Sequence, residues 1–274
     1  MLRERILQRI AQVPGATVGV VFQDVRDGGA LVHVNPDSVF HAASTMKVPV
    51  LIEYFRAVDA GHLRADQDLL LVNEFASIVD GSPYALDAGA DSDSSLYPML
   101  GTRVPLRLLA ERMITRSSNL ATNAMIEVVG APRADATARA LGARATKVLR
   151  GVEDGKAFQA GLSNVTTARD LAALLLAIET GTAASATRCR EMLEILSRQQ
   201  HNSEIPAGLP AGTRVAHKTG WITGVLHDAA LVYPEGRGPY VLVVLTKGIA
   251  DRDVARELIV DISRMVWERA TGPR

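Results

Sequence analysis

The sequence is short of several residue types, and each shortage excludes a class of protein. Cys189 is the only cysteine among 274 residues, so the chain can form neither an intrachain disulfide nor a CxxC metal site. Aromatic residues make up 4% of the chain and the formal net charge is zero, which argues against base-stacking platforms and a basic surface for nucleic acid. The six histidines show neither H-x-x-x-H nor H-E-x-x-H spacing, which argues against a zinc hydrolase. We therefore expect no metal, no cofactor and no nucleic-acid partner.

Long hydrophobic runs are also missing. No stretch approaches the ~18 consecutive apolar residues of a membrane span. Residues 1–13 lack the unbroken apolar run of about 7–15 residues that a secretory signal requires, and their apolar residues follow a helical stripe instead. We expect a monomer that is not bound to a membrane. As the sequence stands, the expected location is cytoplasmic, and it would be periplasmic or secreted if a leader had been removed.

Strand-like alternation occurs near both ends of the chain, whereas helical periodicity fills the middle. Strands are predicted over residues 16–25, 30–34, 214–221, 226–233 and 240–247, with a turn at Arg26-Asp27-Gly28-Gly29. Helices are predicted before Pro14-Gly15 and over residues 44–60, 105–115, 118–129, 166–179, 185–200 and 251–270. Pro49 is expected to cost the second of these helices one hydrogen bond and to bend it.

These elements predict an α+β fold in two parts. The five strands form one antiparallel sheet, with the N- and C-terminal helices over one face. Residues 1–45 and 205–274 are expected to form this lobe, and residues 46–204 an inserted helical lobe, with the active site between them. Within the insert, residues 73–101 read as a solvated loop because turn-forming residues dominate it. Tyr97, near the end of this loop, is a candidate for lining the mouth of the cleft.

Three short patterns, each present once, carry residues suited to acyl transfer: Ser44-Thr45-Met46-Lys47 (S-x-x-K), Ser117-Ser118-Asn119 (S-x-N) and Lys218-Thr219-Gly220 (K-T-G). Ser44 stands at a predicted helix start, where its hydroxyl meets the positive end of the helix dipole. Lys47 follows one turn later on the same face. A desolvated lysine can release its proton near neutral pH and then accept the serine proton. The alternative is a helix cap beside a solvated lysine.

The second and third patterns supply further polar groups. The Ser117 hydroxyl could relay a proton, although capping of the predicted helix is the alternative role for this segment. The Lys218 ammonium attracts a substrate carboxylate and Thr219 can donate to it, whereas the alternative is an exposed lysine on an edge strand. Gly220 is expected to let a ligand approach the backbone closely. His227-Asp228 lies opposite this pattern in the predicted hairpin, where it either tunes Lys218 or holds the two strands together.

The order and context of the three patterns resemble the penicillin-binding and class A β-lactamase-like serine hydrolases. The resemblance extends from Ala16 to the last helix, and it is most specific in the segments FHAASTMK (residues 40–47) and MITRSSNLATN (residues 113–123). It implies a β-lactamase/transpeptidase-like fold. It also implies a small-molecule substrate, either a β-lactam or another amide or ester that carries a carboxylate.

The resemblance implies a role for each residue of the patterns. Ser44 is implied to be the acylated nucleophile, with Lys47 as its proton acceptor or electrostatic support. Ser117 is implied to shuttle a proton and Asn119 to orient the substrate.

The resemblance also implies how the substrate is held. Lys218 and Thr219 would anchor its carboxylate, with Gly220 beside them. The backbone N–H groups of Ser44 and Trp221 would form the oxyanion hole, whose loss typically costs ~3 kcal/mol of transition-state stabilisation.

The chain departs from the family pattern at two places. Ser118 stands where the middle motif usually has aspartate, a residue that supports the loop more than the chemistry. Glu153 falls where class A enzymes carry the glutamate that activates the deacylating water. No Leu-Asn pair follows it, and Ala157 occupies the place of the asparagine. The alternative is that Glu153 is a surface acid or an ion-pair partner of Arg150.

Three functions remain open from the sequence. The first is β-lactam hydrolysis through a Ser44 acyl-enzyme, with Glu153 directing water. The second is an acyl-serine esterase, amidase or D-Ala-type peptidase of the same fold. The third is a catalytically silent module that uses the cleft to bind a ligand, although burying Ser44 beside Lys47 would then be needlessly costly.

Overall fold

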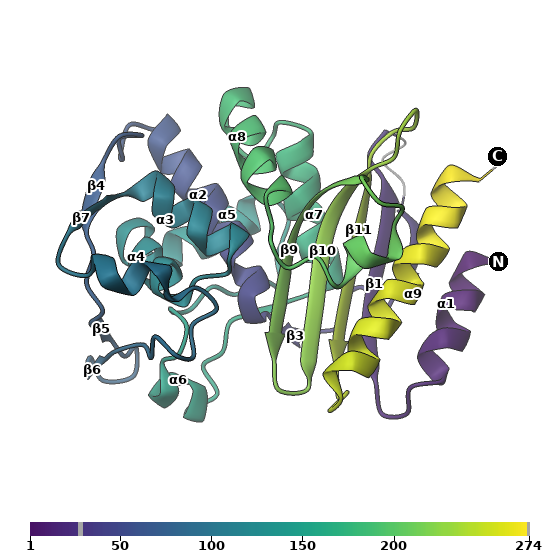
Figure 1. Cartoon of the computed structure of the whole chain (residues 1–274), viewed down its shortest axis with the longest axis horizontal. Helices are drawn as coiled ribbons and strands as arrows, with labels where there is room; N and C mark the ends of the chain where they lie inside the picture. The colour runs from purple at the N-terminus through teal and green to yellow at the C-terminus, as the bar shows by residue number, and fades with distance from the viewer. Residues whose placement is uncertain (27–29, 273–274) are drawn as a thin grey trace.

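A five-stranded antiparallel sheet forms one end of the molecule in the computed structural model, which describes residues 1–26 and 30–272 (Figure 1). The strand order is β2-β1-β11-β10-β9. The strands are β1 (Thr17–Asp24), β2 (Ala30–Val34), β9 (Arg214–Ile222), β10 (Val225–Tyr233) and β11 (Tyr240–Lys247). The predicted five strands and the α+β class are therefore confirmed. Residues 27–29 of the predicted turn lie outside the described part of the chain.

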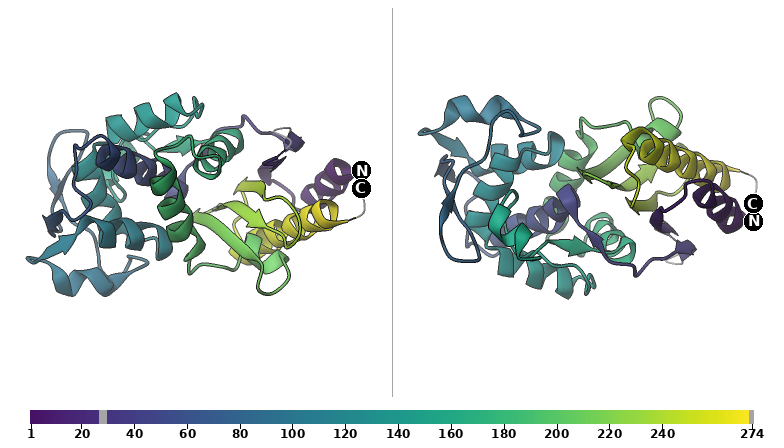
Figure 2. Two further views of the ribbon diagram at one scale, coloured as in Figure 1. Left: turned by 90° about the horizontal axis from the view of Figure 1, so that it is seen from above. Right: turned by 90° about the horizontal axis from the view of Figure 1, so that it is seen from below.

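Two helices cover one face of this sheet, namely α1 (Leu2–Ala11) and α9 (Arg252–Thr271) (Figures 1 and 2). Alternation along β11 explains the packing, because every second side chain points to the same face. Leu242 and Val244 join the core under α1 and α9, whereas Val243 and Leu245 join the core on the other face. The termini therefore meet over one side of the sheet.

The opposite face is covered by α7 (Ala168–Glu179) and α8 (Ala186–Ser197). Leu171, Leu175 and Ile178 of α7 are buried in the same core as the strands. Both helices come from the segment that was predicted to be an inserted helical lobe, yet they pack on the sheet because its second face is also apolar. The division of the chain into lobes at residues 45 and 205 stays a prediction.

The remaining helices are α2 (Lys47–Asp59), α3 (Leu106–Thr115), α4 (Asn119–Val129), α5 (Ala131–Ala140) and α6 (Gly155–Gln159). Nearly all of α2 is buried, so it forms the centre of the helical part. The predictions missed α5 and α6, whose short runs of alanine and polar residues show little periodicity. Pro49 is the third residue of α2, within its first turn, where proline is tolerated better than in a helix interior.

Residues 73–101 are not the solvated loop that the composition predicts. They contain β5 (Phe75–Ala76), β6 (Pro83–Tyr84) and the 3₁₀ helix η2 (Ser94–Met99), and β4 (Asp68–Leu70) and β7 (Arg103–Pro105) flank them. Phe75, Leu86 and Leu96 are buried in the helical core. These apolar residues are too widely spaced to produce a periodic signal, but they anchor the segment.

Three short elements complete the frame around the site. They are β3 (Phe40–His41), which pairs with β8 (Val165–Thr166), and the 3₁₀ helices η1 (Ala43–Met46) and η3 (Ile205–Gly208). Across residues 1–26 and 30–272, no helix combines the length and the apolar character needed to cross a bilayer.

Candidate active site

Ser44 lies on η1, a tight 3₁₀ turn that leads directly into α2, rather than at the start of the α-helix itself. Ala43 enters this turn with a φ of 46°, in the left-handed region that side chains rarely adopt. Ser44 is half-buried, and its N–H is among the free donors at a helix start. The turn therefore presents a partly accessible hydroxyl beside a free backbone amide.

Gly220 explains how β9 reaches this turn. A Cβ built on Gly220 would lie 3.0 Å from Ser44 N and 3.1 Å from Thr45 N. The absence of a side chain thus lets the strand press against the nucleophile turn. The predicted close approach of a ligand to the Gly220 backbone stays a prediction.

Lys47 is completely buried, which excludes the solvated lysine of the alternative interpretation. Its Nζ donates to Ser117 O at 2.6 Å, to Ser117 Oγ at 3.2 Å and to Asn119 Oδ1 at 3.0 Å. Ser44 is not among its hydrogen-bond partners in the described part of the chain. Burial, reinforced by the charge of Lys218, holds the Lys47 pKa well below its usual value. The first and second patterns therefore meet at this amine.

Lys218 is also completely buried and approaches the same hydroxyl from the sheet. Its Nζ donates to Ser117 Oγ at 3.0 Å and to Thr219 O at 2.8 Å. Burial lowers the Lys218 pKa to about 7. Ser117 holds this position with a φ of 58°, a strained conformation that often marks functional residues. All three patterns thus converge on one oxygen atom, with two amines whose charges disfavour each other.

The two buried lysines give stability a predicted pH dependence. In the unfolded chain both bind a proton up to about pH 10, whereas in the fold burial lowers both pKa values. Between pH 7 and 9 the unfolded state therefore binds more protons, so the free energy of unfolding should rise with pH. The slope should reach up to about 1.4 kcal/mol per pH unit for each lysine. Urea unfolding at pH 7, 8 and 9 measures it, and Lys218→Met should remove part of the slope. A flat or falling profile in the wild type would contradict the burial of charge described here.

Asn119 connects Lys47 to Glu153. Its Oδ1 accepts from Lys47 Nζ at 3.0 Å, and its Nδ2 donates to Glu153 Oε1 at 2.6 Å. Glu153 has a φ of 61°, and one side of its carboxylate is open to solvent. Partial burial raises the Glu153 pKa. Arg150 donates to Leu162 O and Gly151 O instead, so the alternative of a Glu153–Arg150 ion pair is wrong.

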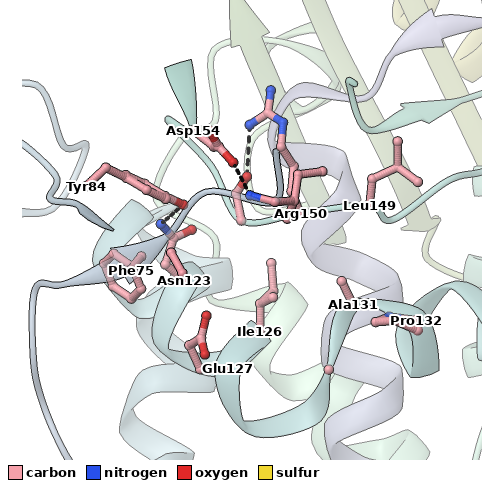
Figure 3. Close-up of a pocket in the computed structure, with 14 residues that line it drawn as sticks. Phe75, Tyr84, Asn123, Ile126, Glu127, Ala131, Pro132, Leu149, Arg150 and Asp154 are labelled. Carbon is pink, nitrogen blue, oxygen red and sulfur yellow. Dashed lines mark hydrogen bonds between the residues drawn. The ribbon is translucent and has the colours of Figure 1, made fainter. Parts of the chain in front are cut away.

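Asn123, one turn after Asn119 on α4, fixes the loop that carries Glu153. Figure 3 shows the Asn123 amide bonded to Tyr84, close to Arg150 and Asp154. Its Oδ1 accepts from Val152 N at 2.7 Å, and its Nδ2 donates to Val152 O at 3.0 Å and to Tyr84 Oη at 3.2 Å. A Cβ on Gly151 would lie 2.5 Å from Asn123 Oδ1, so any side chain there would displace the Asn123 amide. Asn123 therefore binds both the N–H and the C=O of Val152, the residue just before Glu153.

The position of the missing asparagine has a different role in this chain. Ala157 is fully buried in α6, and its N–H donates to Asp154 Oδ1 at 3.0 Å. Asp154 also accepts from Ser77 Oγ and Ile78 N, both at 2.9 Å. This carboxylate ties the loop to the β5–β6 segment. Support for Glu153 thus comes from Asn119, Asn123 and Asp154.

Replacing Asn123 by alanine should slow the step that uses Glu153 by about 10- to 100-fold, because a misplacement of ~1 Å can cost that much. It should also destabilise the fold by about 1–3 kcal/mol, since the Val152 N–H and C=O lose their partner. Asn73→Ala is the matched control, because Asn73 clamps Leu86 through the same pair of bonds at 2.9 Å. The control should lose stability but keep the rate. If the Glu153-dependent step were equally fast in Asn123→Ala and Asn73→Ala, Asn123 would have no role in positioning Glu153.

Trp221 has the backbone orientation that an oxyanion hole requires. It lies on β9, the edge strand of the sheet. The Thr219 carbonyl accepts from Lys218 Nζ and therefore faces away from β10, and backbone orientation repeats every second residue of an antiparallel strand. The Trp221 N–H accordingly points off the sheet edge. Its indole is 51% exposed and stacks on the Arg252 guanidinium at 4.4 Å from the ring centroid.

A family model for the beta-lactamase enzyme family matches residues 1–270. The chain belongs to this family. A beta-lactamase of Streptomyces albus G is 27% identical to it over 97% of this chain and 83% of that protein. The solved structure of PBP-A is 31% identical, with a TM-score of 0.82 over 98% of this chain and 95% of that one. A beta-lactamase structure from Sphaerobacter thermophilus DSM 20745 is 27% identical, with a TM-score of 0.80 over 98% of each chain. The predicted β-lactamase/transpeptidase-like fold is confirmed.

In this member of the beta-lactamase family, residues 227 and 228 lie opposite the third pattern as predicted, with His227 paired to Gly220 and Asp228 to Thr219 across β9 and β10. His217 Nδ1, not His227, lies 2.9 Å from Asp228 Oδ1, and His217 Nε2 lies 3.0 Å from Asn202 Oδ1. His227 points to the opposite face, 2.9 Å from His41 O, and burial lowers its pKa to about 4. Successive side chains of a strand point to opposite faces, so of these two residues it is Asp228 that serves the predicted roles. It joins β10 to β9 through His217, and its charge opposes the burial that lowers the Lys218 pKa.

Tyr97 is anchored by its hydroxyl, and its place at the mouth of the cleft stays a prediction. Its hydroxyl donates to Asp91 Oδ2 at 3.2 Å, and burial raises its pKa. Sequence reasoning missed Asp91, His217 and Asn123. Of these, only Asn123 left a signal, namely its spacing of four residues from Asn119 on a predicted helix.

Proposed function

We propose that this protein is a serine β-lactamase of the class A type, which opens the β-lactam amide through an acyl-enzyme on Ser44. The observation that carries the proposal is the convergence of Lys47 and Lys218 on Ser117 Oγ, directly beside the turn that holds Ser44. Membership of the beta-lactamase family and relatives named beta-lactamases support it.

Acylation requires a base for the Ser44 proton and an acid for the leaving nitrogen. With its pKa lowered by burial, Lys47 supplies a neutral amine at working pH. As Ser44 Oγ bonds to the lactam carbonyl carbon, its proton passes to this amine. Ser117 Oγ, 3.2 Å from Lys47 Nζ, then hands a proton to the lactam nitrogen as the C–N bond breaks, and takes one from Lys47. The N–H groups of Ser44 and Trp221 stabilise the negative charge that develops on the carbonyl oxygen.

Substrate binding depends on the protonated form of the other buried amine, Lys218. The Lys218 pKa of about 7 leaves this group poised between its two forms in the free protein. A substrate carboxylate placed beside it favours the charged form, and Thr219 would donate a further hydrogen bond to the same carboxylate. Lys47 therefore acts in its neutral form and Lys218 in its charged form. Their shared contact with Ser117 favours this division, because two positive charges there would repel each other.

Deacylation falls to Glu153. Its carboxylate removes a proton from a water molecule as the water oxygen bonds to the ester carbon, and the proton returns to Ser44 Oγ when the ester bond breaks. The hydrogen bond from Asn119 orients the carboxylate, and Asn123 fixes the backbone that carries it. Since only the ionised form serves as a base, the raised pKa of Glu153 places a loss of turnover on the acid side.

A chromogenic cephalosporin and intact-protein mass spectrometry with benzylpenicillin test the proposal together. Hydrolysis without a lasting adduct supports a β-lactamase. A long-lived adduct with negligible turnover supports the alternative, an acyl-serine esterase, amidase or D-Ala-type peptidase. If no adduct forms and no cephalosporin is consumed, the proposal fails.

We also propose that the protein acts as a monomer that is not bound to a membrane, because one chain supplies every group named above. Light scattering during turnover tests the monomer.

A further inference from the structure

Asp91 comes from the segment that the sequence presents as a solvated loop, yet its carboxylate meets the start of α4. Asp91 Oδ1 accepts from Asn119 N and Oδ2 accepts from Leu120 N, both at 2.8 Å. The Tyr97 hydroxyl donates to Oδ2 at 3.2 Å. Asp91 is half-buried by these contacts. A residue 28 positions earlier in the chain therefore binds the backbone of the middle pattern.

The start of α4 needs such a group. The first amides of a helix have no partner within the helix, and a negative charge is favourable there. The local cap is Ser118, whose hydroxyl oxygen accepts from Ala121 N at 3.2 Å. Ser118 is neutral, and it occupies the place where related sequences usually carry an aspartate. In this chain the carboxylate is supplied from outside the helix, by Asp91.

The neighbouring Asp93 keeps this contact in place. It is buried, accepts from Ser95 N at 3.1 Å to cap η2, and pairs with Arg116 at 3.4 Å and Arg112 at 3.9 Å. Arg116 directly precedes Ser117. The loop is thus attached on both sides of the S-x-N pattern, so Asp91 is held against α4 rather than reaching it from a free loop.

The consequence concerns the side chain of Asn119, whose amide touches Lys47 Nζ on one side and Glu153 Oε1 on the other. We propose that Asp91 is a positioning residue for catalysis: by binding the Asn119 and Leu120 amides it fixes the one side chain that joins the acylation base to the deacylation base. This inference rests on the proposed function, because it assigns those roles to Lys47 and Glu153.

Asp91 also contributes charge to both bases. Burial is the main cause of the low pKa of Lys47, and Lys218 lowers it further, whereas Asp91 opposes them. Burial is likewise the main cause of the raised pKa of Glu153, and Asp91 adds to it, with a smaller contribution from Asp87. Removing the charge at position 91 should therefore move the acid limb of the rate profile to lower pH.

The first readout does not depend on activity. Amide hydrogen exchange at Asn119 and Leu120 should be at least tenfold faster in Asp91→Asn than in the wild type, because an amide side chain offers one acceptor where the carboxylate offers two. Asp87→Asn removes the same charge from the same loop, and Asp87 Oδ1 accepts from Gly89 N within that loop. This control should leave both exchange rates unchanged. Unchanged exchange in Asp91→Asn would overturn the inference even if the protein hydrolysed no β-lactam.

The second readout is kinetic. With benzylpenicillin, kcat of Asp91→Asn should fall about 10- to 100-fold while KM stays within about threefold, since the substrate anchors at Lys218 and Thr219 are untouched. Asp91→Glu, which keeps the charge but misplaces it, should lose kcat without moving the acid limb. If the wild type is acylated and Asp91→Asn keeps kcat within twofold with its acid limb in place, Asp91 is not a positioning residue. If the wild type is not acylated, the proposed function fails, and the exchange measurement alone decides the contact.

Discussion

Replacing Ser44 by alanine is expected to lower kcat/KM for benzylpenicillin by about 10⁴- to 10⁶-fold, the usual cost of removing a nucleophile. The residual rate would come from binding and from the oxyanion donors alone, because no covalent intermediate could form. The N–H at position 44 is unchanged by the substitution, so substrate binding should persist. Steady-state hydrolysis, with tight binding of intact penicillin measured by calorimetry, tests both halves of this expectation.

Ser38→Ala is the matched control, because Ser38 is another partly buried serine and lies just before β3, outside the site. It should hydrolyse penicillin at the wild-type rate. If Ser44→Ala kept more than about 1% of wild-type turnover, the nucleophile would have to be sought elsewhere, and the roles given to Lys47 and Ser117 would lose their basis.

The second large effect is expected at Glu153. Glu153→Gln should still be acylated at close to the wild-type rate, because Lys47 and Ser117 handle the acylation proton. Its deacylation should slow by about 10²- to 10⁴-fold, the usual contribution of a general base. The acyl-enzyme would then accumulate, and its decay can be followed by intact-protein mass spectrometry after excess penicillin is removed.

Glu127→Gln provides a comparison for this variant, since Glu127 is also an exposed acid but lies two turns along α4 from Asn119. Its acyl-enzyme should turn over as fast as that of the wild type. A release rate in Glu153→Gln equal to that in Glu127→Gln would show that the missing Leu-Asn pair has left position 153 without a role.

Much of the site could be predicted, because several of its residues are close to one another in sequence. Ser44 and Lys47 are one turn apart, and Lys218, Thr219 and Trp221 follow the alternation of a single strand, so short-range geometry is sufficient to predict their relation. The strands and the long helices were predictable for the same reason. Their apolar residues repeat with one period over enough positions to be read.

The groups that hold the site in place could not be predicted in this way. Asp91 and Asn123 act through backbone amides of distant segments, and such contacts leave no periodic pattern. The close contact of Gly220 with the turn that carries Ser44 was not predicted, because a sequence does not show which distant segment a glycine faces. His217 was missed as the partner of Asp228, because this diagonal contact between β9 and β10 depends on the register of the two strands.

The central claim is that a hydroxyl at position 44 becomes covalently acylated beside the amines of Lys47 and Lys218. The most direct measurement is peptide mapping by mass spectrometry of Glu153→Gln after a brief reaction with benzylpenicillin. We expect one equivalent of penicilloyl group on the peptide that contains Ser44, and none in the Ser44→Ala/Glu153→Gln double variant. An adduct on any other residue, or no adduct in Glu153→Gln under conditions where the wild type consumes penicillin, would contradict the account.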